Sequence, residues 1–261
     1  MTHWFALLSP LVQALLAGMF TWSITALGAA AVFALRHTGV FCMNAALSFA
    51  AGVMTAASFW SLLSPAVDLT HTLGFNPVFI PCLGFFTGGM LLFTWDAVQT
   101  RLSEGTPSLR LRQMLFTSVT LHNIPEGLAV GVAFGCLPCR LEGATLTAAC
   151  MITLGIGLQN FPEGAAVSLP MLREGSSRSG AFLRGVISGS VEVPAALCGA
   201  LLALQTRKAL PFLLSFSAGA MIYAVVKEMV PTAQTGKHSA LTAMFAIAGF
   251  CLMTAMDVGL G

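Results

Sequence analysis

The chain has 261 residues, of which 56% are hydrophobic and only 8% are charged, and its mean hydropathy is +0.85. A soluble domain carries about 25% charged residues, so this composition excludes an ordinary soluble protein. The net charge of +2, without a dense basic patch, also excludes nucleic-acid binding as the main function.

Apolar runs of roughly 20 residues recur along the chain, which is the pattern of an all-α, polytopic membrane protein. The connections between the runs are too short to hold a soluble domain, so residues 1–261 are interpreted as one membrane domain. Met1–Trp4 lacks the basic region of a signal peptide, so the first run is expected to remain as a helix. Eight transmembrane segments are predicted, approximately Phe5–Leu35, Phe41–Ser64, Pro77–Gln99, Leu111–Gly135, Ala144–Leu172, Phe182–Leu204, Leu210–Pro231 and Ala240–Leu260.

The basic residues are distributed unequally between the two sides of the predicted membrane domain. Nine lie in or beside the connections after the first, third, fifth and seventh segments, and three lie on the other side. Because cytoplasmic loops carry an excess of Lys and Arg, the richer side is predicted to face the cytoplasm and both termini to lie outside. The fourth and fifth segments then cross the membrane in opposite directions.

These two segments share a polar motif. His122-Asn123-Ile124-Pro125-Glu126-Gly127-Leu128-Ala129-Val130 recurs 37 positions later as Gln159-Asn160-Phe161-Pro162-Glu163-Gly164-Ala165-Ala166-Val167, with six of nine residues identical. Ionisable side chains inside a membrane are costly, and they mark functional sites by default. A matched pair of Gly/Pro-interrupted segments in opposed orientation indicates a transporter's binding site near the middle of the membrane.

The spacing of the motif predicts a shared cation site. Residues i and i+4 lie on one face of a helix, so His122 and Glu126 point the same way, as do Gln159 and Glu163. Facing each other across an antiparallel pair, they would present an imidazole nitrogen, an amide oxygen and two carboxylates to one cation.

A second cation position is predicted beside the first. Asn123 and Asn160 lie one step further round each helix and offer more oxygens, while Glu126 and Glu163 are placed to bridge both positions. Glu192 falls in the middle of the sixth segment and is expected as an extra ligand of the second position.

Prolines and glycines within the motif support this interpretation. Pro125 and Pro162 each free a backbone carbonyl one turn earlier, which a membrane tolerates only beside a cavity or another partner. Gly127 and Gly164 allow close helix approach. The alternative is a kinked pair held by interhelical hydrogen bonds, which would leave two carboxylates with too few donors.

Five further residues are candidates for the transport path, and each has a structural alternative. Two lie in or just after a Gly/Ala-rich stretch and can equally be packing residues. For the carboxylates near the ends of the second and third segments the alternative is a solvated side chain. For the carboxylate near the end of the seventh segment it is a surface ion pair. These candidates are Met54, Ser58, Asp68, Asp96 and Glu228.

The ligand types indicate the ion. A histidine nitrogen with carboxylate and amide oxygens suits zinc, cadmium, iron or manganese rather than copper(I). Cys136 and Cys139 form a Cys-Leu-Pro-Cys pair in a connection, where a structural role is favoured over metal binding. No organic cofactor is expected.

Two other functions stay open. An ion-coupled carrier of a small organic solute would use paired carboxylates, but the clustered His and Asn would be surplus to it. An intramembrane metal-dependent hydrolase is disfavoured because the chain has no His-Glu-x-x-His sequence and its five histidines include only one deep in a segment.

The motif pair resembles that of the ZIP (Zrt-, Irt-like protein) metal transporters, and the GufA-like branch in particular, in which the fifth segment begins Gln-Asn-Phe-Pro-Glu-Gly. The resemblance covers essentially the whole chain. It implies uptake of zinc and related divalent metals into the cytoplasm through a binuclear centre, with the residues predicted above as its ligands. It also implies a homodimer in the cell membrane, and alternating movement of segments 1, 4, 5 and 6 against segments 2, 3, 7 and 8.

Two departures from the family pattern bear on metal choice. Many members have His where this chain has Gln159, which predicts a lower affinity and a broader choice of metal. Many also carry a long His-rich loop between segments 3 and 4, whereas here that loop, about Thr100–Arg110, has no histidine.

Overall fold

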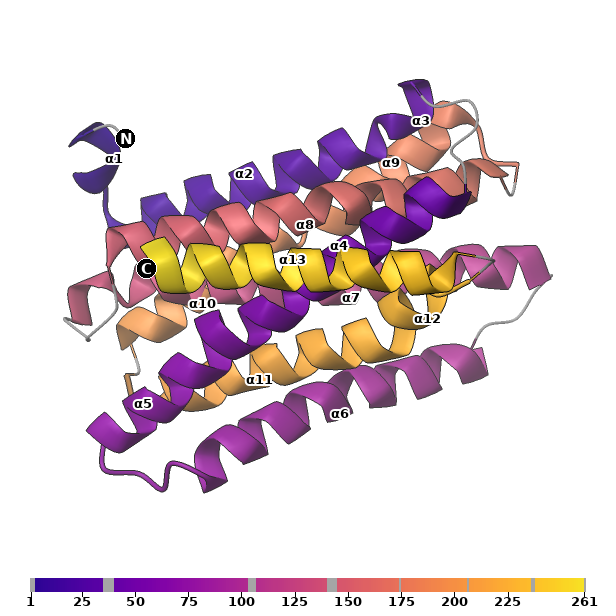
Figure 1. The fold of residues 1–261 in the computed structure, drawn as a ribbon. Coiled ribbons are helices and arrows are strands. Elements are labelled where there is room, and N and C mark those ends of the chain that lie inside the picture. Colours follow the sequence, from indigo (N-terminus) through magenta and orange to yellow (C-terminus); the bar gives the residue numbers. More distant parts are fainter. Residues whose placement is uncertain are drawn as a thin grey trace.

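The computed structural model describes residues 3–34, 40–102, 107–139, 145–173, 175–205, 207–235 and 238–260. Every regular element within these ranges is helical, and the long helices lie side by side in one bundle (Figure 1). The all-α class predicted from composition is confirmed. α1 and the last turn of α13 lie at the same end of the bundle, as an even number of crossings requires.

The elements are labelled in chain order in Figure 1. The first part contains α1 (His3–Ala6), α2 (Pro10–Ala29), α3 (Ala31–Ala34), α4 (Val40–Ala57), the π-helix η1 (Ser58–Leu63), α5 (Ser64–Thr72) and α6 (Phe79–Leu102). The centre contains α7 (Pro107–Gly135), the 3-10 helix η2 (Leu137–Cys139) and α8 (Leu146–Arg173). The last part contains α9 (Arg178–Gly189), α10 (Glu192–Gln205), the 3-10 helix η3 (Arg207–Ala209), α11 (Leu210–Ala224), the π-helix η4 (Val225–Met229), α12 (Val230–Ala233) and α13 (Ser239–Leu260).

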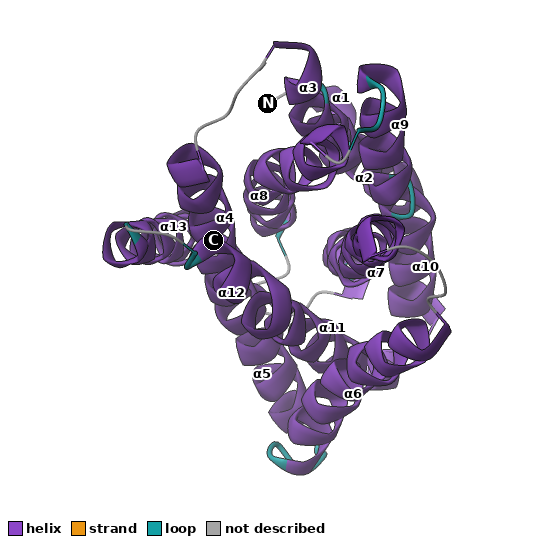
Figure 2. Cartoon of the chain, turned by 90° about the vertical axis from the view of Figure 1, so that its right-hand side faces the viewer, coloured by secondary structure: helices purple, strands orange, loops and turns teal. Residues whose placement is uncertain are grey.

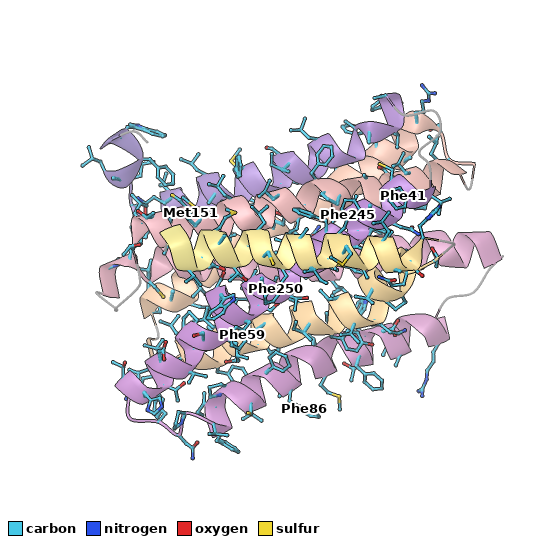
Figure 3. The ribbon with its side chains drawn as sticks, viewed as in Figure 1. Phe41, Phe59, Phe86, Met151, Phe245 and Phe250 are labelled. Carbon is cyan, nitrogen blue, oxygen red and sulfur yellow. The ribbon has the colours of Figure 1, made fainter. Side chains whose placement is uncertain are left out.

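Large apolar side chains cover the outside of this bundle. Phe86 on α6 is 66% exposed, and Figure 3 shows it pointing away from the other helices. An outward apolar surface of this kind suits lipid rather than water. Six stretches of the described residues are long and apolar enough to cross a membrane: Pro10–Ala34, Val40–Thr72, Phe79–Val98, Arg178–Gln205, Leu210–Ala233 and Ser239–Gly259.

The chain is therefore an integral, multi-pass membrane protein. α7 and α8, with 29 and 28 residues, are also long enough to cross a bilayer, but they carry the polar motif. The total of eight crossings and the outside location of the termini stay predictions.

Three predicted segments are interrupted in the structure or extend well beyond their predicted ends. The first is interrupted after α1, because Ser9 caps α2 through its side chain and Pro10 occupies the first turn. The second continues as helix to Thr72, since Pro65 stands in the first turn of α5 and needs no donor there. The sixth is split between α9 and α10, where Pro194 cannot donate to the preceding turn.

A second internal repeat is visible in α4 and α11. Ser48–Ala57 and Ser215–Ala224 have six of ten residues identical. Each passes directly into a π-helix, η1 or η4, and a proline follows shortly after. Each also has one principal partner, since α4 packs along α13 and α11 packs along α6. The outer helices are thus repeated across the bundle, as α7 and α8 are at its centre.

The helices fall into two groups by their contacts. In the central group, α2 packs along α8, and α10 packs along α7 and α2, with α9 against α8 and α2. The flanking group consists of the pairs α4–α13 and α6–α11, joined to the central group mainly by α4 against α8 and α11 against α7. Seen end-on in Figure 2, α7 and α8 lie on the inner side of the surrounding helices.

The packing differs between these interfaces. Within the central group a Cβ atom on Gly127 would collide with the backbone of α10, and one on Gly164 would collide with the carbonyl of Thr25 on α2. Glycine therefore sets the helix spacing there. Between the groups, the fully buried Met54 and Met221 belong to the same apolar cluster as residues of α7 and α8.

Candidate metal centre

The two motif copies meet at the middle of the bundle. α7 and α8 run in opposite directions beside each other, and each contains the motif proline within a continuous helix (Figure 1). Five motif side chains are buried, with exposed fractions between 0 and 4%: Asn123, Glu126, Gln159, Asn160 and Glu163. The side chain of His122 and that of Cys139 lie outside the described residues.

Glu126 and Gln159 join the two helices directly. The Nε2 atom of Gln159 donates to the Oε1 atom of Glu126 over 2.7 Å. A carboxylate can only accept, so the glutamine must turn its nitrogen toward Glu126 and its oxygen away. That oxygen, and the second oxygen of Glu126, are buried without a hydrogen-bond partner.

The two motif asparagines are oriented in the same way. Asn123 donates from Nδ2 to the carbonyl of Ser188 over 2.9 Å. Asn160 donates from Nδ2 to the Oε2 atom of Glu192 over 2.8 Å, and the carbonyl of Thr21 lies 3.3 Å from the same nitrogen. Since all of these partners are acceptors, both asparagines also present their oxygen atoms as the unused end.

The unused oxygens are concentrated in the motif. Within the part of the chain that the structure describes, nine buried side-chain atoms lack a hydrogen-bond partner, and all are oxygens. Six of them belong to the five motif residues above, including both carboxylate oxygens of Glu163. Buried acceptors without donors are costly. A divalent cation held by oxygen ligands would satisfy several of them at once.

Carboxylates alone do not form the centre. Among the described side chains, no group of three or more His, Cys, Asp or Glu is arranged to hold a metal ion. The charges of Glu163 and Glu192 act on Glu126 with like sign, so the carboxylates repel one another. A cation bound here would therefore need the unpaired amide oxygens of Asn123, Gln159 and Asn160 as well.

Glu192 differs from the motif carboxylates because each of its two oxygens accepts a hydrogen bond. It is the first residue of α10, where the helix dipole favours a negative charge. Its Oε1 atom accepts from the hydroxyl of Thr25 over 2.9 Å, and its Oε2 atom accepts from Asn160. The structure thus places Glu192 beside the motif, as expected, with each oxygen accepting one hydrogen bond and keeping a second lone pair.

Sequence reasoning missed three residues that hold this arrangement. Thr21 and Thr25 lie on α2, one turn apart, and Ser188 supplies a backbone carbonyl from α9. The spacing of the threonines was a visible signal, because it places two hydroxyls on one face of an apolar segment. Threonine in membrane helices also bonds to its own helix, so this signal alone does not indicate a site.

The candidate path residues are dispersed. Met54 and Ser58 are buried, and the hydroxyl of Ser58 donates to the carbonyl of Met54. Asp68 is exposed on α5, and Glu228 lies partly buried on η4. Asp96 on α6 takes part in a polar network, described next.

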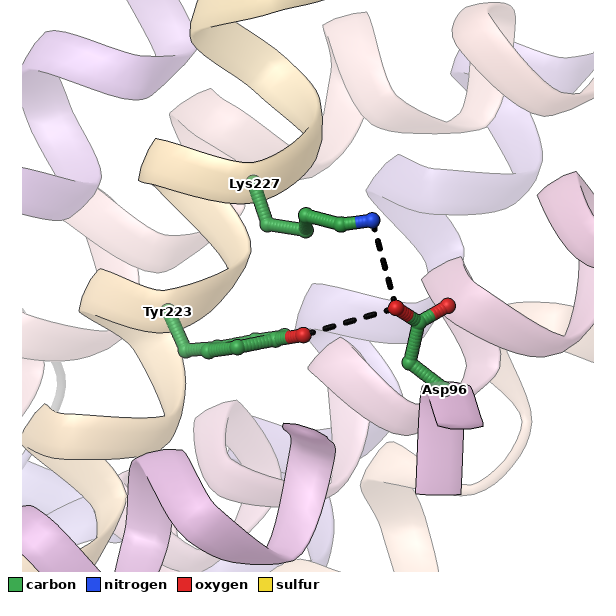
Figure 4. A network of polar contacts seen from close by, with 3 residues as sticks. All are labelled: Asp96, Tyr223 and Lys227. Carbon is green, nitrogen blue, oxygen red and sulfur yellow. Dashed lines mark hydrogen bonds and ion pairs between the residues drawn. The ribbon is translucent and has the colours of Figure 1, made fainter. Parts of the chain in front are cut away.

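Asp96 links α6 to the C-terminal end of α11 and to η4 (Figure 4). Its Oδ2 atom lies 3.2 Å from the ammonium nitrogen of Lys227 and accepts from the hydroxyl of Tyr223 over 3.5 Å. The Lys227 side chain is 51% exposed and that of Asp96 is 26% exposed. Asp96 is therefore ion-paired in this conformation, whereas the sequence indicates a solvated carboxylate as the alternative to a role on the path.

Comparison with known proteins gives consistent matches over the chain. A family model described as ZIP Zinc transporter matches residues 96–257. Zinc transporter ZIP11 of Bos taurus is 34% identical, with 97% of this chain and 98% of that protein covered. Zinc transporter ZIPB of Bordetella bronchiseptica is 34% identical over 95% of this chain and 81% of its own length. Zinc transporter GufA of Myxococcus xanthus is 30% identical, with 96% and 98% covered.

Proposed function

The chain belongs to the ZIP zinc transporter family, and from that premise we propose that it carries zinc and related divalent cations across a membrane into the cytoplasm. The cations would pass through a binuclear centre between α7 and α8. The relatives compared above are named as zinc transporters, which supports zinc as the transported substrate. The family consists of transporters, and we assign no catalytic residue.

The observation that carries this proposal is the set of unpaired oxygens. Among the described side chains, three amides donate through their nitrogen atoms and leave their oxygens without partners, and neither oxygen of Glu163 has a donor. A site for an organic solute would need donors as well as acceptors. The unpaired oxygens among the described residues are all acceptors, and such a surface fits a metal cation.

Two neighbouring cation positions account for the ligand set. We assign His122, Glu126, Gln159 and Glu163 to the first position, and Asn123, Asn160 and Glu192 to the second, with Glu126 and Glu163 shared. Sharing is supported by the oxygens themselves. Glu126 uses one oxygen for Gln159 and keeps one, whereas Glu163 keeps both.

The composition of the site supports a choice among divalent metals. One imidazole with several carboxylate and amide oxygens suits zinc and tolerates cadmium, iron and manganese. Neutral amide oxygens in place of further carboxylates limit the negative charge. Conduction requires binding that is strong enough to capture the ion but weak enough to release it, and a mixed site of this kind is consistent with that balance.

The division into central and flanking groups supports alternating movement during transport. All of the proposed ligands lie on α7, α8 and α10, which belong to the central group. Movement of this group relative to α4, α6, α11 and α13 would carry the complete centre as one body. Buried methionine at the boundary, such as Met54, adapts easily to changed packing.

The remaining parts of the proposal concern the environment of the chain. The distribution of basic residues supports inward transport with both termini outside. Bacterial relatives support the cell membrane as the location. The homodimer implied by the family resemblance stays a prediction, which chemical cross-linking in the membrane would test.

Zinc uptake by proteoliposomes tests the proposed function. Wild-type protein should load zinc into vesicles containing a zinc-sensitive dye, and Glu126→Gln should abolish most of that uptake. Glu104→Gln, in the predicted loop between the third and fourth segments, changes a carboxylate outside the centre and should leave uptake unchanged. Absence of uptake by the wild type, or full uptake by Glu126→Gln, would contradict the proposal.

A further inference from the structure

We infer that Thr25 on α2 is a positioning residue for the second cation position. It acts through Glu192, and through Glu192 it fixes the direction in which Asn160 presents its oxygen. This inference rests on the proposed function, because it concerns the same centre. It adds a residue from outside the two motif helices, on an element that the ligand motif does not include.

The first argument is the hydrogen bond itself. The hydroxyl of Thr25 lies 2.9 Å from Glu192 Oε1 and 3.3 Å from the carbonyl of Thr21. A hydroxyl has one hydrogen, and a carboxylate is the stronger acceptor, so Thr25 donates to Glu192. Glu192 is fully buried, and hydrogen bonds to buried charges are among the strongest in proteins.

The second argument is that the surrounding backbone is shaped for Thr25. A Cβ on Gly164 would collide with the carbonyl of Thr25, so α8 can approach α2 here only through glycine. A Cβ on Gly189 would lie 2.9 Å from the Thr25 Cγ2 and 3.2 Å from Glu192 Oε1. Glycines on two other helices therefore allow those helices to pack closely around Thr25, whose hydroxyl lies against the carboxylate.

The third argument is the consequence for Asn160. With Thr25 donating to Oε1 of Glu192, the Oε2 atom remains for Asn160 Nδ2 at 2.8 Å. The amide must then turn its Oδ1 atom the other way, where it is buried and unpaired. If Glu192 lost the hydroxyl of Thr25, it could rotate, and the amide of Asn160 would be held only by the longer contact of its Nδ2 atom with the carbonyl of Thr21, 3.3 Å. Thr25 thus acts on the oxygen of Asn160 without contacting the cation.

Zinc uptake by proteoliposomes containing the full chain tests this role. Thr25→Val keeps the shape but removes the donor, so the KM for zinc should rise about tenfold, the effect of one charge-assisted hydrogen bond. The kcat should change far less than the KM. Thr25→Ser restores a hydroxyl and should keep the KM within about twofold of wild type.

Thr153→Val is the matched control. Thr153 is buried on α8, and its hydroxyl donates only within its own helix, to the carbonyl of Ala149 over 2.8 Å. It should transport like wild type. A Thr25→Val variant that matched this control would overturn the inference, as would a Thr25→Ser variant as impaired as Thr25→Val. An inactive wild type would instead reject the proposed function.

A zinc-binding titration of purified protein covers the case in which Thr25→Val does not fold. Thr25→Ala should weaken zinc binding about tenfold in the wild-type background. It should add less than about twofold in a Glu192→Gln background, since residues in one hydrogen-bond network are not additive. Equal losses in both backgrounds would show that Thr25 does not act through Glu192, and would overturn the inference.

Discussion

Glu163 and Glu192 are both buried carboxylates of the central helices, yet their surroundings differ completely. Glu192 stands at the start of a helix and accepts from Thr25 and Asn160. Glu163 stands inside α8, and neither of its oxygens has a donor among the described residues. Glu192 is stabilised by hydrogen bonds within the protein, whereas Glu163 would be stabilised by a bound cation.

This difference indicates that the two buried carboxylates have different roles. A buried charge is costly unless it is paired or hydrogen-bonded. Glu192 meets that requirement permanently and can serve as a fixed support for the amide of Asn160. Glu163 meets it only when its oxygens bind something positive. A transport site needs both kinds of carboxylate. If every oxygen of the centre already accepted hydrogen bonds from the protein, none would be available to bind the ion.

The largest expected effect compares the two residues directly. Glu163→Gln removes a shared ligand charge and should lower zinc kcat/KM by about a hundredfold or more, whereas Glu192→Gln should lower it about tenfold. Uptake by proteoliposomes at matched protein content measures both. Equal losses would remove the proposed distinction between Glu163, a ligand shared by both positions, and Glu192, a ligand of one position that also supports Asn160.

Metal choice sharpens the comparison within the first cation position. Gln159→His replaces an amide oxygen by an imidazole, which suits zinc better than manganese. We expect the ratio of zinc to manganese uptake to rise about tenfold, the effect of roughly 1.4 kcal/mol. Competition between the two metals in the same vesicles measures the ratio.

Gln13→His is the matched control for this change. Gln13 is a buried glutamine on α2, 3% exposed, and its Nε2 atom donates to the carbonyl of Phe5 over 2.9 Å. The same substitution there should leave the metal ratio unaltered. A similar change of the zinc-to-manganese ratio in both variants would mean that the metal preference does not depend on Gln159.

Stability without metal should change in opposite directions at the two carboxylates. Glu163→Gln replaces an unpaired buried carboxyl by an amide that can donate to the neighbouring oxygens, so the apparent unfolding temperature in detergent should rise by about 3 °C per kcal/mol gained. Glu192→Gln replaces an acceptor by a donor facing Thr25 or Asn160, so that temperature should fall by a similar amount. Thermal unfolding after treatment with a chelator measures both, and shifts of the same sign would contradict the comparison.

The fold was largely predictable because its strongest signal is local. Long apolar runs predict membrane helices, and the ends of α7 at Gly135 and of α13 at Leu260 agree with the sequence. The errors lie where apolarity continues through a break. Leu7 and Leu8 are as apolar as the residues of a membrane helix, but they lie between two helices, because Ser9 and the following proline begin α2.

The site was predictable only on the helices that carry its motif. A repeated i, i+4 pattern is visible in a sequence, and it correctly indicated that α7 and α8 would lie together. Which end of each amide is used, and which residues hold Glu192, depend on contacts between distant segments. Thr25 and Glu192 are 167 positions apart, and no local pattern joins them.

The smallest effect is expected at the network of Asp96, Tyr223 and Lys227, which extends the comparison to partly exposed groups (Figure 4). Unlike Glu163, Asp96 has an ion-pair partner and a hydrogen-bond donor, and unlike Glu192 its side chain is partly exposed. Exposed ion pairs contribute about 0–1 kcal/mol, so Lys227→Met should change stability by no more than that. Zinc uptake by Lys227→Met and by Asp96→Asn should stay within about twofold of wild type. A severe loss of uptake in Asp96→Asn, with uptake by Lys227→Met unchanged, would instead place the Asp96 carboxylate on the path of the ion. A role on the path depends on the charge of Asp96 but not on that of Lys227, whereas the ion pair depends on both charges.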